Sequence, residues 1–557
     1  MRRRDLLAAA AVTPVLPAQT PAIDPAVVAR HDSAVETYLK LQITDPSSRW
    51  HGGFLDEYGL CYAGTAAGSW TIFVPAFLHP GSKFHKNALM IDRLRLSAQH
   101  LARMQNAEGN IDNPVTNFNS PADLSFAVRG AATAAVLAAR AGDRELTAIM
   151  EPFLRKAGGA LAAGGVHTAN HRWVVCAALA QLNELFPSRT YTQRIDRWLA
   201  EGIDIDEDGQ FAERSTSQYN PIVDSALVVM AAKLKRPELL DAARRNLDSM
   251  LYLMHGDLEP VTEISRRQDR NQPGSMVSYW FALRYLATHD GNGQFATLAR
   301  IFQERAASLA ILMEYPELSA PLPATAPLPD DYEREFRKLG ITRIRRRSLS
   351  ATLFLSHNSR FLNVRDGDAV VSAVRFASAF FGKGQFVPAG AEKKAGAYVF
   401  EQPELVAAYY QPLEKARSVP ADEDEWYRIR KERKATEVCR LVQSAEVTEI
   451  PNGLRVRVRS QGTSNVPAAI EVSLRAGGKL ENCVAAPNTP DGWLLGSGHA
   501  QYTMGADTVR IGPGLGEHRY TQVRGAEAKI PGPAVYLCGF TPFDHTFEIV
   551  FSTNRER

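Results

Sequence analysis

Four kinds of side chain that can bind an acid and move a proton occur close together in this sequence. Asn170 and His171 stand side by side in HTANHRW, and Tyr219 ends the segment DEDGQFAERSTSQY. An arginine-rich stretch, TEISRRQDR, runs from Thr262 to Arg270. An amide, an imidazole, a phenol and guanidinium groups can together hold an acidic sugar and remove a proton from it.

Asn170 and Tyr219 both precede predicted helices. An apolar helix is expected to begin near Arg172, so Asn170 would be its N-cap, a position that favours Asn. Such a helix start offers free N–H groups and a positive dipole end to an anion, which His171 would also reach. Pro221 at a first helical position predicts another helix start just after Tyr219. Packing of Tyr219 as a hydrophobic staple is disfavoured, because the fourth helical residue is the polar Asp224.

The arginine stretch lies in a long break between helices, from about His255 to Gly274, and breaks of this length are usually functional or disordered. Arginine can grip carboxylates through paired hydrogen bonds. The alternative is a solvated, charged loop. Arg266 is the predicted catalytic arginine, and the predicted substrate-binding residues are Arg267, Arg270, Glu263, His255, Glu213 and His357.

Metal and cofactor motifs are weak. Asp204, Asp206, Asp208 and Gly209 follow the start of an EF-hand loop, but Ser215 occupies the twelfth position, where a bidentate Glu is expected. A turn rich in Asp residues is the simpler interpretation. The five cysteines are scattered without zinc-site spacing. No cofactor or metal is therefore predicted, although structural calcium or zinc stays open.

Length and composition indicate a globular protein of more than one domain. At 557 residues the chain exceeds one ordinary core, and 45% hydrophobic with 22% charged residues is close to the average for globular proteins. A net charge of +3 is too small to indicate a nucleic-acid partner, so an acidic ligand would be bound by local cation clusters. The oligomeric state is left open.

The first 22 residues are typical of an export signal. A basic start precedes an apolar run from Leu6 to about Leu16, and Arg3-Arg4-Asp5-Leu6-Leu7 resembles the twin-arginine pattern. The alternative is a frayed, Ala-rich helix. No later stretch reaches about 18 uninterrupted apolar residues, so no membrane insertion of the mature protein is expected. We predict a periplasmic or secreted protein.

The remainder divides into three parts. Residues 25–315 show apolar residues at three- and four-residue spacing, which predicts about ten or eleven helices in successive hairpins. They would form a solenoid closed on itself or an open array. The Pro-rich segment 316–335 is predicted to be a linker.

Residues 336–557 show short β-branched and aromatic runs separated by turns, which predicts an antiparallel β-sandwich. The arginines at 343, 345, 346 and 347 are expected on a charged edge strand. The charged interval Leu413–Lys434 is expected to be a helical or irregular insertion.

The sequence resembles the heparinase II/III-like and related toroid polysaccharide lyases. The matching residues are Asn170, His171, the run Asp208–Glu213 and Tyr219, and Ile264-Ser265-Arg266 is similar to an arginine motif of the chondroitin and hyaluronate lyase branch. The resemblance implies a multi-domain α + β fold, with an N-terminal (α/α) toroid of helical hairpins followed by a C-terminal antiparallel β-sandwich.

The resemblance also implies β-elimination on a uronic-acid polysaccharide. Asn170, His171 and an arginine would neutralise the uronate carboxylate, and Tyr219 would act as base, acid or both. In this sequence STSQ separates Tyr219 from the preceding acidic and basic residues, a longer gap than the family commonly has, which leaves the base open. One alternative is an (α/α) toroid glycoside hydrolase using two of the carboxyl groups at 208, 213, 224 and 263. The other is an exported glycan-binding protein without catalytic activity.

Overall fold

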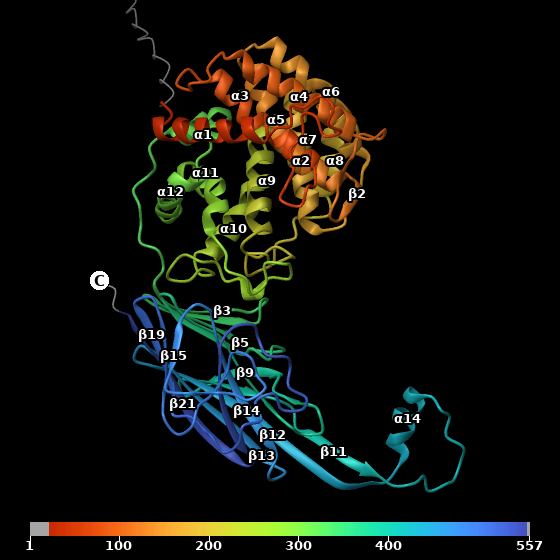
Figure 1. Ribbon diagram of the computed structural model, residues 1–557, viewed down its shortest axis with the longest axis vertical. Helices are drawn as coiled ribbons and strands as arrows, with labels where there is room; N and C mark the ends of the chain where they lie inside the picture. The colour runs from red at the N-terminus through yellow and green to blue at the C-terminus, as the bar shows by residue number, and fades with distance from the viewer. Residues whose placement is uncertain (1–21, 554–557) are drawn as a thin grey trace, which may run out of the picture. The chain divides into compact units, whose positions relative to one another are not determined.

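The computed structural model describes residues 22–553, which form two compact units (Figure 1). The helical unit contains the chain up to Asp248 together with Ser265–Leu328. The β unit contains Ser249–Ile264 together with the chain from Pro329 onward. The predicted export signal, residues 1–22, lies outside the described residues except for its last position.

The helices from Pro25 to Glu314 follow the predicted hairpins. They are α1 (Pro25–Leu41), α2 (Ala63–Gly68), α3 (Trp70–Leu78), α4 (Ala88–Met104), α5 (Pro121–Arg140), α6 (Arg144–Ala163), α7 (Ala169–Leu185), α8 (Arg189–Leu199), α9 (Tyr219–Leu234), α10 (Leu240–Met250), α11 (Trp280–Asp290), α12 (Gly293–Ala306) and α13 (Leu309–Glu314). A short β-hairpin, β1 (Ile111–Asn113) and β2 (Asn117–Ser120), precedes α5.

Alternate helices form two layers. In the inner layer α3, α5, α7, α9 and α11 contact one another in chain order, and in the outer layer α4 contacts α6 and α6 contacts α8. This is the arrangement of an (α/α) toroid, which confirms the predicted fold class. The inner helices are apolar on most sides because they are enclosed by neighbours, and the many alanines of α5 allow close helix packing.

Helix α5 is also long and apolar enough to cross a membrane by length and composition. Most of it is buried within the helical unit, with the run from Ala131 to Ala138 inaccessible to solvent. The core helix of a globular protein has these same properties, so α5 is weak evidence for a membrane span.

The β unit is a sandwich of two sheets. One has the strand order β15-β18-β19-β21-β13-β12-β10-β9, with β11 paired to β12, and the other has β16-β17-β20-β14-β7-β6-β5-β4-β3, with β8 paired to β7. Their strands are β3 (Asp331–Phe336), β4 (Ile341–Arg346), β5 (Leu349–Phe354), β6 (Leu362–Asp366), β7 (Ala369–Ser378), β8 (Gly384–Gln385), β9 (Gly390–Lys394), β10 (Ala397–Glu401), β11 (Leu405–Tyr410), β12 (Ala435–Ile450), β13 (Gly453–Gly462), β14 (Pro467–Leu474), β15 (Lys479–Glu481), β16 (Val484–Ala485), β17 (Gly492–Leu494), β18 (Ala500–Met504), β19 (Asp507–Gly512), β20 (Ala534–Phe540) and β21 (Phe543–Thr553).

Pairing in the sandwich is antiparallel apart from β17 with β20. Residues of both sheets, such as Phe376 and Val472 of one and Val456 and Phe547 of the other, share one buried core. The predicted insertion carries α14 (Glu423–Ile429), as expected for a helical excursion between β11 and β12.

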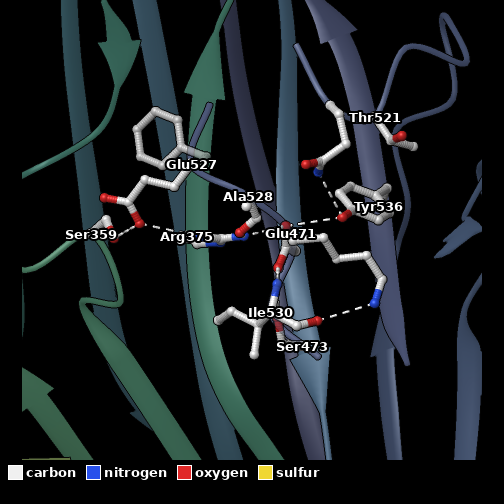
Figure 2. A network of polar contacts seen from close by, with 12 residues as sticks. Ser359, Arg375, Glu471, Ser473, Thr521, Glu527, Ala528, Ile530 and Tyr536 are labelled. Atoms are coloured by element: carbon white, nitrogen blue, oxygen red, sulfur yellow. Dashed lines mark hydrogen bonds and ion pairs between the residues drawn. The ribbon is translucent and has the colours of Figure 1, made fainter. Parts of the chain in front are cut away.

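The buried face of β14 contains a polar network (Figure 2). Glu471 accepts hydrogen bonds from Arg375 Nη2 at 3.0 Å, from Ser473 Oγ at 2.7 Å and from Tyr536 Oη at 3.0 Å. Arg375 also donates to Glu527 Oε2 at 3.2 Å and to the Ala528 carbonyl at 2.6 Å. Both charged groups are therefore paired inside the sheet, as burial requires.

The charged-edge prediction for Arg343 is wrong. Strand β4 lies between β5 and β3, and Arg343 is completely buried. Its guanidinium donates to side-chain oxygens of Ser350 and Thr352 and to backbone carbonyls that include those of Tyr252 and Met254. Arginine in such a site is stabilised by having each donor occupied.

The two units also divide the chain differently from the prediction. The boundary between Leu328 and Pro329 falls inside the predicted linker, but β3 already begins at Asp331. Residues Ser249–Ile264, predicted as part of the helical domain, fold with the β unit because Arg343 binds their carbonyls. Such long-range pairing leaves no periodic signal in the sequence.

Candidate functional site

Three segments of the helical unit meet at the candidate site. They are the first turn of α7, the chain between α8 and the start of α9, and the loop that begins at Ser265. A chain of polar contacts joins them, running from Asn170 through Glu213 and Arg267 to Tyr219 and Gln268. Long-range contacts thus bring together most of the residues predicted in the helical unit.

The first turn of α7 presents Asn170 and His171. The predicted N-cap role of Asn170 is wrong, because the helix begins at Ala169 with Thr168 as its cap residue. Since Asn170 is not needed as a cap, its amide nitrogen donates instead to Glu213 Oε2 at 2.7 Å and to Thr168 Oγ1 at 3.2 Å. The free N–H groups of this helix start remain a positive dipole end beside the site.

Glu213 connects the amide to the arginine loop. Its Oε1 lies 3.5 Å from Arg267 Nη1, and the backbone carbonyl of Glu213 accepts from the N–H of Arg266 at 3.0 Å. Burial raises the pKa of the Glu213 carboxyl, although Asn170 and Arg267 act in the opposite direction. Glu213 is therefore held by a donor and a cation in a site that disfavours its charge.

Tyr219 is the first residue of α9, two residues before the predicted start at Pro221. Its N–H donates to Ser215 Oγ at 3.1 Å, which fixes the start of the helix. The guanidinium of Arg267 lies 5.0 Å from the centre of its ring, and its hydroxyl accepts from Gln268 Nε2 at 2.6 Å. A cation over the ring and a donor on the oxygen both stabilise negative charge developing on the phenol.

Asp269 ties the arginine loop to the segment before α9. This buried carboxylate accepts hydrogen bonds from Ser265 Oγ and from the N–H of Ser217, the latter at 3.2 Å. Two segments far apart in the chain are thereby held together, and Arg267 is positioned over Tyr219.

His171 lies in an environment that keeps its imidazole neutral. Burial lowers the pKa of His171 to about 4, and the neighbouring charges of His167 and Arg267 add to this effect. Its ring makes edge contacts with Phe126 at 5.8 Å and with His167 at 4.8 Å. A neutral imidazole near neutral pH offers one donor and one acceptor rather than a positive charge.

Two buried polar atoms of this turn have no hydrogen-bond partner among residues 22–553. They are Asn170 Oδ1 and His171 Nδ1. Buried polar groups are nearly always paired with protein or ordered water, and each exception needs an explanation. Both atoms belong to residues predicted to bind substrate, so a ligand group is a direct explanation.

Arg266 and Arg270 make fewer contacts with the candidate site than Arg267 does. Arg266, predicted as the catalytic arginine, is exposed, and its Nη1 donates to the Ala212 carbonyl at 3.3 Å. Arg270 is also exposed. Arg267, predicted only for binding, is the arginine beside both Glu213 and Tyr219.

Three predicted residues belong to the β unit. His255 is buried and hydrogen-bonded through Nδ1 to Ser350 Oγ at 2.9 Å, and its pKa is lowered well below the ordinary value by burial and by neighbouring arginines such as Arg365. Glu263 accepts from Asn363 Nδ2 at 2.6 Å. His357 is exposed on a turn with φ of 55°. His255 Nε2 and Glu263 Oε2 are buried and have no hydrogen-bond partner among the described residues, so the substrate-binding role of both residues stays a prediction.

The aspartates before Glu213 support a turn. Asp206 Oδ1 accepts from the N–H groups of Asp208 and Gln210 at 3.0 and 2.9 Å, and Asp204 Oδ1 accepts from Arg172 at 2.9 Å and from Trp173. Within residues 22–553 there is no cluster of three His, Cys, Asp or Glu side chains arranged to hold a metal ion. The first two aspartates of the EF-hand-like pattern, Asp204 and Asp206, thus bind protein donors.

Several site residues escaped the sequence analysis. Gln268 stands inside the arginine stretch but has no distinctive pattern. Phe126 comes from α5, and His167 lies just before α7. Asp224 was predicted only as one of four candidate carboxyl groups of the hydrolase alternative and as a polar residue where a staple needs an apolar one. It is completely buried, neither carboxyl oxygen has a partner among the described residues, and burial raises its pKa well above the ordinary range.

Comparison with known proteins identifies solved structures of similar fold. No protein-family model and no curated protein matches the sequence. The chain is similar to the structure of chondroitin AC lyase from Streptomyces coelicolor A3 in complex with chondroitin sulphate, with a TM-score of 0.52, 12% identity, and coverage of 98% of this chain and 81% of that chain. It is also similar to Paenibacillus xanthan lyase, with a TM-score of 0.50, 11% identity, and coverage of 96% of this chain and 57% of that chain.

At such low identity the likeness establishes the fold alone. The chain has the architecture of these polysaccharide lyases, a helical toroid followed by an antiparallel β-sandwich, which confirms the predicted resemblance at that level.

Proposed function

We propose that this protein is a polysaccharide lyase that cleaves a uronic-acid-containing polysaccharide by β-elimination. The observation that carries the proposal is the placement of Tyr219 beneath Arg267, within a contact chain that ends at the buried Asn170 amide. The shared architecture with chondroitin AC lyase and xanthan lyase supports the same chemistry without establishing it.

The reaction requires removal of the C5 proton of a uronate and loss of the oxygen at C4. Ionised uronate resists losing this proton, because the resulting anion would carry a second negative charge beside the carboxylate. Asn170, the N-terminus of α7 and Arg267 supply donors and positive charge that would stabilise this anion. The neutral His171 would add a hydrogen bond rather than a charge.

Tyr219 is the proposed proton carrier. As phenolate it would take the C5 proton, and as phenol it would give a proton to the departing oxygen at C4. The Arg267 charge over its ring and the Gln268 donor on its oxygen stabilise the phenolate that exists before the first step and forms again after the second. The product would carry a 4,5-unsaturated uronate at its new end.

The paired-carboxyl alternative of a glycoside hydrolase is less well supported. Asp224 is completely buried and has no hydrogen-bond partner among residues 22–553, and Glu263 is bound to Asn363 in the β unit. Glu213 is engaged by Asn170 and Arg267. The substrate class that fits the site is an acidic polysaccharide, and the export-like residues 1–22 lead us to propose that the protein meets it in the periplasm or outside the cell.

A direct test incubates the purified protein with a panel of uronate polysaccharides and follows ultraviolet absorbance of the unsaturated product. Tyr219→Phe should lose about 10²- to 10⁴-fold in turnover, the usual contribution of a positioned proton carrier. Tyr58→Phe is the matched control, because Tyr58 is an exposed tyrosine of the helical unit and its variant should retain full activity.

Two outcomes would reject the proposal. Release of reducing sugar without ultraviolet absorbance would identify a hydrolase. Binding of a glycan by the intact protein with no turnover, and equally by the Tyr219→Phe protein, would identify a glycan-binding protein.

A further inference from the structure

A second polar site lies inside the helical unit. A cavity of about 380 Å³ is enclosed by residues of α3, α5, α7, α9, α11 and α13. Phe126 is part of its wall, and the same ring contacts His171 of the candidate site at 5.8 Å. The cavity therefore adjoins the first turn of α7, and it lies entirely within one compact unit.

Arg129 carries a charge in this cavity that the protein does not pair. Its guanidinium makes one hydrogen bond among the described residues, from Nη2 to Ser225 Oγ at 3.1 Å, and Nε is buried without a partner. No carboxylate of residues 22–553 lies within ion-pair distance of it. Arg129 is half-buried, and a guanidinium in such a place without an ionic partner is costly unless something else binds it.

The nearby acid is already occupied. Glu314 lies in the cavity wall, and its carboxylate binds Lys233 Nζ at 2.6 Å and accepts from Thr133 Oγ1 at 2.6 Å. Lys233 and Arg140 also share Glu184, at 2.5 and 2.8 Å. The carboxylates of Glu314 and Glu184 thus neutralise Lys233 and Arg140. The charge of Arg129 has no ionic partner among the described residues.

Further unpaired polar atoms lie on the same wall. Gln181 Oε1 and the hydroxyl of Tyr315 are buried and have no hydrogen-bond partner in the described part of the chain. Both residues line the cavity, as do the apolar rings of Phe126 and Phe281. A cation, an amide acceptor, a hydroxyl and aromatic faces together suit a ligand with one negative charge, several hydroxyls and an apolar ring face.

We infer that this cavity is a binding subsite for a single sugar unit bearing one carboxylate, held by Arg129 through its carboxylate and by Gln181 and Tyr315 through its hydroxyls. The assignment of a uronate-type ligand rests on the proposed function, whereas the binding of a monoanion rests on Arg129 itself. The volume lies at the small end of ligand pockets, about 300 to 1,000 Å³, which limits the occupant to one small unit rather than a longer segment of a polymer.

The test is isothermal titration of the full chain with D-glucuronate, with D-glucose and acetate as reference ligands. We expect saturable binding of glucuronate with one site per chain, and binding at least tenfold weaker for glucose and for acetate. Arg129→Gln should weaken glucuronate binding at least tenfold. Arg155→Gln is the matched control, because Arg155 is an exposed arginine on the outer helix α6, and it should bind glucuronate like the unmodified protein.

A second variant covers the case in which Arg129→Gln fails to fold. Ser278 is exposed and lines the cavity, so Ser278→Trp would obstruct it without removing a buried group, and it should also abolish glucuronate binding. Equal affinity for glucose or for acetate would overturn the inference, as would full binding by folded Arg129→Gln or Ser278→Trp. The binding experiment is independent of the lyase assay, because glucuronate is not cleaved. Binding of glucuronate without cleavage of any polymer would reject only the proposed function. Cleavage of a polymer without binding of glucuronate would reject only the subsite.

Discussion

Glu471 in the β unit and Asn170 in the helical unit are both buried polar residues, but their surroundings differ. Both oxygens of Glu471 accept hydrogen bonds, and its partner Arg375 is bound on both terminal nitrogens (Figure 2). Asn170 uses its amide nitrogen and leaves Oδ1 unpaired, and the neighbouring His171 leaves Nδ1 unpaired.

A closed network stabilises one conformation and has no capacity left for a ligand, whereas an open one is destabilising until a further group completes it. Both residues are buried, so burial alone does not distinguish them. We therefore propose a structural role for Glu471 and a binding role for Asn170, and substitutions at the two positions can test this difference.

The largest effect on stability is expected from opening the closed network. Arg375→Met would leave Glu471 as a buried charge with only neutral donors, and should lower the free energy of unfolding by about 3 to 5 kcal/mol. Denaturant titration measures the loss. Turnover per folded molecule on a uronate polymer should stay unchanged, and a selective loss of turnover at full stability would contradict the distinction.

At Asn170 we expect a large loss of turnover and a smaller loss of stability. Asn170→Leu removes a donor near the proposed charge and should lower kcat about 10²- to 10³-fold, the usual effect of losing one such donor. Its free energy of unfolding should fall by only about 1 to 3 kcal/mol, because Glu213 Oε2 loses one donor while the unpaired Oδ1 is removed as well. A stability loss as large as that of Arg375→Met would show that Asn170 is a structural residue.

The smallest effect concerns pH. Because the pKa of His171 is lowered to about 4 from an ordinary 6.5, the unfolded chain binds a proton more readily than the folded one between these values. Its contribution to stability is complete above pH 6.5 and declines as the pH falls toward 4, by no more than about 1.4 kcal/mol per pH unit.

His171→Gln should therefore flatten the decline of stability with acidification in this window, measured by denaturant titration at several pH values. The exposed His499 provides the control, since His499→Gln should leave the slope unchanged. An unchanged slope in His171→Gln would show that the imidazole is not held neutral by burial.

Local pattern was a good guide to the elements. Helices α7 and α9 begin within a few residues of their predicted starts near Arg172 and at Pro221, because apolar spacing reflects which face of a helix is buried. The charged strand β3 was placed in the linker because its polar alternation lacks the usual β-branched residues.

Local pattern was a poorer guide to the roles of polar residues. Arg343 and Arg267 both stand in arginine-rich stretches, yet one is a buried structural residue and the other lies beside Tyr219. His255 and His171 are both buried histidines with a lowered pKa, but His255 belongs to the β unit and binds Ser350. Residue type and spacing do not encode which distant groups will pair with them.

The sequence by itself determined the order of a helical part and a β part, and it singled out Asn170, His171 and Tyr219 as the groups of chemical interest. These follow from local periodicity and from the limited set of side chains that can move protons. Only the tertiary structure decided that Arg267 rather than Arg266 lies over Tyr219, and that Ser249–Ile264 folds with the β unit. The physical reason is that hydrogen bonds and ion pairs form between groups distant in the chain, and their geometry exists only after folding.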